Sequence, residues 1–153
     1  MFSTEKEMSK SFERYLRANF GNTYLKEYQG LFGIPDFIFY AKRENGISII
    51  SFELKLKDWK RASKQAFRYK SFSNIAYVVL SANNANSAAS NIDWFERYNI
   101  GLAKFDEDNH FEIIHKPILS VPYSGQLNSR LKDNINSCRR KFKNIDILIN
   151  EIA

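Results

Sequence analysis

The sequence predicts an α/β domain in which helices cover a sheet, and three observations support this fold class. Apolar residues recur at helical spacing over residues 5–20. They alternate with other residues over 47–56, as in a strand. Residues 75–81 form a short continuous apolar run, which is typical of a strand covered on both faces. A chain of 153 residues with 44% hydrophobic residues is long enough to bury a real core.

The first helix is expected to begin after Thr4, whose side chain can cap it, and to end near Gly21. Its buried stripe should consist of Met8, Phe12, Tyr15 and Leu16. Residues 23–29 are predicted to form the first strand, at an edge of the sheet.

The next two strands, near residues 36–40 and 47–56, are predicted to form a hairpin. An Asn-Gly dipeptide lies between them, and this pair is a strong hairpin signal. Side chains on a strand alternate between its two faces, so Glu53 and Lys55 share one face of the second strand.

Two registers remain open for this hairpin. A turn centred on residues 45–46 sets Asp36 across from Lys55, whereas a turn centred on residues 44–45 sets it across from Glu53. Either register gathers the three charged side chains on one largely apolar face, with cross-strand neighbours about 5 Å apart. Burying charges is costly unless they are paired or bound to metal. The pattern therefore indicates either a salt bridge from Lys55 to one of the acids or a cation shared by both acids.

The metal alternative predicts a particular chemistry. Mg²⁺ prefers oxygen ligands, including one or two carboxylates, and it suits reactions of phosphates. Asp36 and Glu53 would hold Mg²⁺, for which Mn²⁺ can substitute. Lys55 would polarise the attacking water or offset the charge that develops on a phosphate.

A second helix is expected over residues 59–69, capped by Asp58, with Gln65 at the edge of its inner face and Tyr69 at its end. Basic residues are concentrated here: residues 42–70 contain nine basic and three acidic residues, in a chain of net charge +6. A basic surface beside a metal site would bind the phosphates of DNA, although a basic helix face can also simply be solvated. The candidate DNA contacts are Lys57, Lys60, Arg61, Lys64 and Arg68.

The second half of the chain is expected to contain a loop over residues 83–90, a helix ending at residue 98, and a hairpin formed by residues 100–105 and 111–115. The acidic turn of that hairpin lacks the spacing of a calcium loop, and we expect it to be solvated. His110 and His115 are predicted to be non-catalytic. With two histidines and one cysteine in the chain, no zinc site is expected.

The C-terminal segment carries apolar residues at heptad spacing, which predicts one long amphipathic helix. We expect residues 1–120 to form the core and residues 121–153 to form a helical extension, which either packs on the core or forms a homodimer contact. The seam consists of Leu131, Ile135, Cys138, Phe142, Ile145, Ile149 and Ile152.

The ordered residues Pro35-Asp36, Glu53-Leu54-Lys55 and Gln65 resemble the PD-(D/E)xK nuclease superfamily, which includes restriction endonucleases and Holliday junction resolvases. The resemblance covers roughly the first half of the chain. It implies a restriction endonuclease-like mixed central sheet flanked by helices. It also implies that Asp36 and Glu53 hold the metal, Lys55 serves the water, Gln65 lines the site and Tyr69 supports it.

Many members of this superfamily add a carboxylate from the first helix, for which Glu5 and Glu13 are the candidates. Glu5 falls within the apolar stripe, whereas Glu13 lies well off its centre. The N-terminal part of the helix should also lie near Asp36. Both arguments favour Glu5.

The expected function is that of a Mg²⁺-dependent endodeoxyribonuclease of a repair, junction-processing or defence type, with RNA as an open alternative substrate. A non-catalytic nucleic-acid-binding or assembly module on the same fold is the second hypothesis. A structural domain with an internal ion pair is the third. No apolar run is long enough to span a membrane, and a single cysteine fits a reducing cytosol, so a cytoplasmic location is expected.

Overall fold

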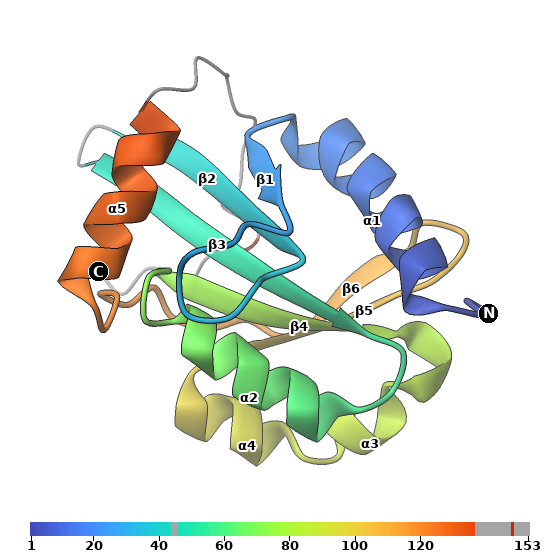
Figure 1. Cartoon of the computed structure of the whole chain (residues 1–153). Helices are drawn as coiled ribbons and strands as arrows, with labels where there is room; N and C mark the ends of the chain where they lie inside the picture. The colour runs from blue at the N-terminus through green and yellow to red at the C-terminus, as the bar shows by residue number, and fades with distance from the viewer. Residues whose placement is uncertain (44–45, 137–147, 149–153) are drawn as a thin grey trace.

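The fold is α/β, with a six-stranded mixed sheet and helices on both of its faces (Figure 1). The computed structural model describes residues 1–43, 46–136 and 148. In chain order the elements are α1 (Glu5–Phe20), β1 (Tyr24–Lys26), β2 (Phe37–Arg43), β3 (Gly46–Lys55), α2 (Trp59–Tyr69), β4 (Ile75–Ser81), the 3₁₀ helix η1 (Ala82–Asn84), α3 (Asn86–Ala89), α4 (Ile92–Tyr98), β5 (Gly101–Phe105), β6 (Phe111–His115) and α5 (Gly125–Asn136).

The strands lie in the sheet in chain order, from β1 to β6. β1, β2 and β3 are antiparallel neighbours, β3, β4 and β5 are parallel, and β6 returns antiparallel to β5. Parallel neighbours need a crossover connection, and α2 supplies one while the segment from η1 to α4 supplies the other. The predicted α/β class with a mixed sheet is confirmed.

Alternation along the strands divides the core into two layers. The even-numbered residues of β3, such as Phe52, face α1 and its buried Met8, Phe12 and Leu16. The odd-numbered residues of β3 face α2, α4 and α5. Every residue of β4 is buried, as the apolar run predicted.

The cap of α1 is the predicted one, since the backbone N–H of Glu7 donates to Thr4 Oγ1 at 3.1 Å. The first strand is shorter than predicted and ends at Lys26. Glu27 has a φ of 49°, in the left-handed region, which breaks the extended conformation there.

The predicted loop over residues 83–90 is largely helical, comprising η1 and α3. Ala85 and Ala88 are buried against the α2 side of the core, and alanine has the highest helix propensity. The small side chains that resembled a loop therefore allow a short helix to pack closely.

The described helix of the C-terminal segment is α5, whose Leu131 and Ile135 are fully buried in the α2-side core. Farther along, Leu148 is buried in the α1-side core, and its carbonyl accepts from the Tyr77 hydroxyl at 2.8 Å. The remaining seam residues, Cys138, Phe142, Ile145, Ile149 and Ile152, lie outside the described residues, so the long helix and its dimer contact stay predictions. Among the described residues, no helix combines the length and apolar character needed to cross a membrane.

Candidate metal centre at the end of β3

The hairpin register places the two predicted metal ligands opposite each other. Phe37 pairs with Phe52, so continuing the ladder by one residue sets Asp36 across from Glu53. This is the register centred on residues 44–45, and the alternative across from Lys55 is wrong. Both registers bury the same side chains, which is why the apolar pattern could not choose between them. Asp36, Glu53 and Lys55 meet where β2 begins and β3 ends.

The Asp36 side chain is fixed by the end of the strand. Its backbone N–H donates to the Phe52 carbonyl at 3.1 Å, and the backbone N–H of Leu54 donates to Asp36 Oδ2 at 2.7 Å. The Asp36 carboxylate thus accepts a hydrogen bond from β3 just beyond the point where the backbone pairing of β2 and β3 ends. Burial raises the pKa of Asp36 to about 6, although the Leu54 bond acts in the opposite direction.

Glu53 is more deeply buried, with 5% of its surface exposed. The Tyr69 hydroxyl donates to Glu53 Oε1 at 2.6 Å and also lies 3.1 Å from the Ile34 carbonyl oxygen. Burial, and secondarily the neighbouring Asp36, raise the pKa of Glu53 to about 8. Two adjacent buried carboxylates cannot both ionise cheaply, so without a cation the pair tends to retain a proton.

The chemistry of these donors fits a divalent cation. Within the part of the chain that the structure describes, neither Asp36 Oδ1 nor Glu53 Oε2 accepts a hydrogen bond. Each carboxylate therefore has one oxygen fixed by the protein and one oxygen available. Two available carboxylate oxygens are the hard ligands that Mg²⁺ prefers, and a divalent charge would favour ionisation of both acids.

The ion pair of Lys55 involves α1 rather than the sheet. Lys55 Nζ lies 3.7 Å from Glu5 Oε2, and no ion pair to Asp36 or Glu53 forms among the described residues. The charge of Glu5 also helps to raise the pKa of both sheet acids. The salt bridge considered from the sequence, from Lys55 to one of those acids, is therefore not the arrangement found.

The other first-helix candidate, Glu13, belongs to a separate network. Its carboxylate accepts from the Tyr24 hydroxyl at 2.7 Å and pairs with Arg17 and Lys26. The Tyr24 bond is the main reason that the pKa of Glu13 is lowered. Of the two glutamates, the structure brings Glu5 to the candidate centre and leaves Glu13 elsewhere.

Gln65 lies one helical turn before Tyr69, on the same face of α2. Its Oε1 is buried and has no hydrogen-bond partner within the described residues. An unsatisfied buried acceptor is costly. The atom therefore needs a donor that the described protein residues do not supply, such as an ordered water.

Two segments that contribute to the centre, α1 and α2, also carry basic side chains. The predicted DNA contacts on and before α2 are all exposed: Lys57, Lys60, Arg61, Lys64 and Arg68. A hollow of about 400 Å³ has Asp36 in its wall. Its other lining residues are Glu5, Lys6, Ser9, Lys10, Lys26 and Glu27.

Sequence reasoning missed the three lysines of this hollow. The spacing of Lys6 and Lys10 by four residues does place them on one face of α1. What the spacing does not reveal is that this face turns toward Asp36, because that depends on how α1 packs against the sheet. Lys26 is already paired with Glu13, so Lys6 and Lys10 are the better candidates for contacting phosphate.

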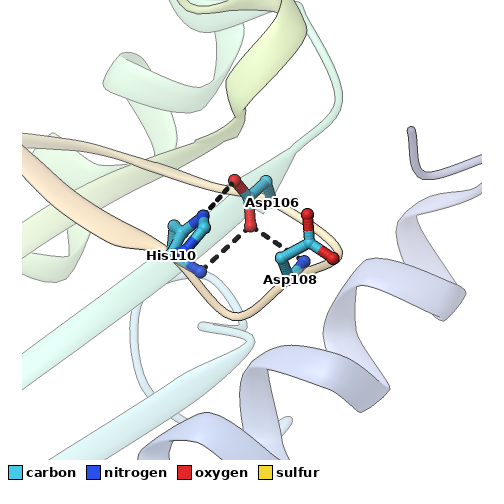
Figure 2. A group of neighbouring side chains, drawn as sticks. All are labelled: Asp106, Asp108 and His110. Atoms are coloured by element: carbon cyan, nitrogen blue, oxygen red, sulfur yellow. Dashed lines mark hydrogen bonds and ion pairs between the residues drawn. The ribbon is translucent and has the colours of Figure 1, made fainter.

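A second group with metal-ligating side chains lies on the turn between β5 and β6 (Figure 2). Candidate ligand atoms of Asp106, Asp108 and His110 lie within 4.8 Å of one another. Asp106 Oδ1 accepts from the backbone N–H groups of Asp108 and His110, and its Oδ2 lies 3.0 Å from His110 Nδ1. These bonds hold the turn together and lower the pKa of Asp106, chiefly through the His110 N–H. The group could bind a metal ion, but Asp106 already has partners.

Comparisons with known proteins give no relative from which a role could be transferred. No family model matches this chain, and neither a curated protein nor a solved structure matches it. The roles of its residues must therefore be argued from the geometry and chemistry of the site.

Proposed function

We propose that this protein is a Mg²⁺-dependent nuclease that hydrolyses phosphodiester bonds in DNA, with the restriction endonuclease-like arrangement of the PD-(D/E)xK superfamily. One observation carries the proposal: two buried carboxylates, Asp36 and Glu53, meet at the end of β3 with one oxygen of each available. Asp36 and Glu53 would hold Mg²⁺, whose chemistry would be to activate a water and to neutralise charge on the reacting phosphate.

Each residue of the centre has a defined task in this proposal. Leu54 and Tyr69 hold the two acids in place through their hydrogen bonds. Lys55 presents an ammonium beside the acids, where it would polarise the attacking water or offset charge on the phosphate. Glu5 positions that ammonium through its ion pair.

The surroundings of the centre support an anionic substrate. Lys6 and Lys10 line the hollow that has Asp36 in its wall, and α2, which contributes Tyr69 to the centre, has an exposed basic face. Basic side chains that flank a metal centre concentrate a polyanion and fix its phosphates. DNA is the proposed substrate, and RNA offers the same phosphate chemistry.

Cleavage of plasmid and branched DNA in Mg²⁺ or Mn²⁺ tests the proposal. Asp36→Asn and Lys55→Ala should each lower the cleavage rate by about 100-fold or more, because they remove a metal ligand and a charge-stabilising group. Asp108→Asn is the matched control, since it changes the second acidic group and should leave cleavage unchanged. Full activity in both site variants, or loss of activity in the control alone, would refute the assigned centre.

A non-catalytic nucleic-acid-binding module is the second candidate, and the exposed basic residues of α2 favour it. Such a module would bind DNA with strong salt dependence but would have no use for a cation. Absence of cleavage and of a Mg²⁺ effect on binding, together with salt-dependent DNA affinity, would support it over the nuclease.

A further inference from the structure

A second hollow, of about 460 Å³, is lined by residues of α2 and α4. These two helices lie side by side on one face of the sheet (Figure 1). The volume of the hollow is within the range of roughly 300–1,000 Å³ that accepts small organic groups. The wall contains four aromatic rings and two cationic side chains and has no acidic residue. The lining residues are Phe32, Ser63, Lys64, Phe67, Arg68, Trp94, Tyr98 and Ile100.

The aromatic wall is held in place by the fold. Trp94 Nε1 donates to Ser63 Oγ at 3.0 Å, and the Ser63 hydroxyl donates to the Lys60 carbonyl. The rings of Trp94 and Tyr98 lie 5.0 Å apart, and Phe67 meets Tyr98 edge-on at 5.8 Å. Rings that are already fixed lose little freedom when a ligand arrives.

The cations of this hollow lie on its rim and face solvent. Lys64 and Arg68 are one turn apart on α2, and both are exposed. The Arg68 guanidinium lies 5.7 Å from the centre of the Phe32 ring, which is half exposed. Lys70, by contrast, is buried and donates to the Tyr98 carbonyl, so it helps to build the wall.

Flat rings within and cations at the rim match a nucleotide. Each of the nucleobases can stack on an aromatic side chain, so such binding tolerates any sequence. The attached phosphate pairs with lysine or arginine. A base in a duplex is already stacked on both sides and paired, so it cannot enter such a hollow. An unpaired base is free to enter it.

The same two segments build this hollow and the metal centre. Phe32 lies four residues before Asp36, and Arg68 directly precedes Tyr69, which contacts Glu53. The segment before β2 and the last turn of α2 therefore each contribute one residue to the hollow and one to the centre.

We propose that this hollow binds an unpaired nucleobase of a single strand, with its phosphate on Lys64 and Arg68. The inference rests on the proposed nuclease function and specifies its substrate class: nucleic acid that contains an unpaired stretch, such as a flap, a bubble or a free single strand.

Binding without metal separates this inference from the catalytic proposal. Fluorescence anisotropy in EDTA would compare labelled single-stranded DNA, single-stranded RNA and duplex DNA of equal length. The wild-type protein should bind single-stranded DNA, single-stranded RNA or both more tightly than the duplex. Comparing its affinity for the two single strands shows whether deoxyribose or ribose is preferred. Phe67→Leu keeps an apolar side chain but removes a ring, and it should weaken single-strand binding about tenfold while leaving duplex binding unchanged.

Two further variants complete the test. Phe32→Ala changes an exposed loop residue and should weaken single-strand binding in the same direction even if Phe67→Leu does not fold. Val121→Ala, an exposed apolar change outside the hollow, should have no effect. Tighter binding to duplex than to single strand, or unchanged single-strand affinity in folded ring variants, would overturn the inference, even if the Asp36→Asn result upholds the nuclease. Acidic peptide binding that depends on Phe67, without single-strand binding, would also overturn it.

Discussion

The two acidic groups of this protein differ in how far the fold has already satisfied them. On the β5–β6 turn, both oxygens of Asp106 have partners in the turn itself, and its pKa is lowered. At the end of β3, burial raises the pKa of Asp36 and Glu53, and one oxygen of each has no hydrogen bond from the described residues. Both groups contain carboxylates that lie close together. The difference is that the buried pair must either retain a proton or gain a cation, whereas the Asp106 carboxylate is already satisfied by hydrogen bonds within its turn.

The largest expected difference between the two groups is in metal binding. Glu53→Gln should abolish Mg²⁺ binding at pH 8, because the amide removes one of two anionic ligands. Asp106→Ala should leave that binding intact. Isothermal titration calorimetry checks this, and Mg²⁺ binding that survives Glu53→Gln but is lost in Asp106→Ala would reverse the assignment.

The next effect is on thermal stability in EDTA, where the two groups should respond with opposite signs. The folded-state pKa of Glu53 is raised from 4.5 to about 8, so between these values the folded protein binds more protons than the unfolded chain. Stability from this group therefore falls as pH rises through that interval. Glu53→Gln removes the penalty and should raise the melting temperature at pH 9 by a few degrees, about 2–4 °C per kcal/mol.

Asp106 has the reverse linkage. Its lowered folded-state pKa adds stability above pH 3.8 that is lost as pH falls through the folded-state value. Asp106→Ala should thus destabilise the protein at pH 7, by about 1 kcal/mol for the turn bonds it removes. Scanning calorimetry of both variants in EDTA checks that Glu53→Gln raises the melting temperature at pH 9 and that Asp106→Ala lowers it at pH 7. A lower melting temperature for Glu53→Gln at pH 9 would contradict this expectation.

The smallest effect is a shift in the pH dependence of cleavage. The Tyr69 hydroxyl stabilises ionised Glu53 and so lowers its pKa relative to burial alone. Tyr69→Phe should move the acidic limb of the pH–rate profile to higher pH, by up to about one unit. Tyr123→Phe removes an exposed hydroxyl away from the centre and should leave the profile unchanged. A profile that does not move in Tyr69→Phe would exclude this role.

Local patterns were sufficient to predict much of the fold. The Thr4 cap, the apolar stripe of α1 and the continuous run of β4 are signals contained within a few residues, and the structure has those elements there. The hairpin register and the helical segment after β4 were not predictable in the same way. The two possible hairpin registers bury the same side chains, so the apolar pattern does not distinguish them. The helical segment after β4 depends on the packing of Ala85 and Ala88 against distant parts of the chain.

The candidate centre was likewise predictable where it depends on local patterns and not where it depends on tertiary packing. Strand alternation was enough to bring Asp36, Glu53 and Lys55 together on one face. The partner of Lys55 and the basic side chains near Asp36 come from α1, whose docking at the end of β3 is a tertiary event. Periodicity reports which face of a helix is buried but not which strand end that face meets.

Under the proposed function Asp36 would have two tasks, since one of its oxygens accepts from the Leu54 backbone N–H while the other would bind the proposed cation. A descendant protein without the proposed nuclease activity would still need an acceptor at this position, so drift toward asparagine, serine or threonine should be tolerated better than drift toward an aliphatic residue. Sequence change at residue 36 would then record the loss of one task separately from the loss of the other.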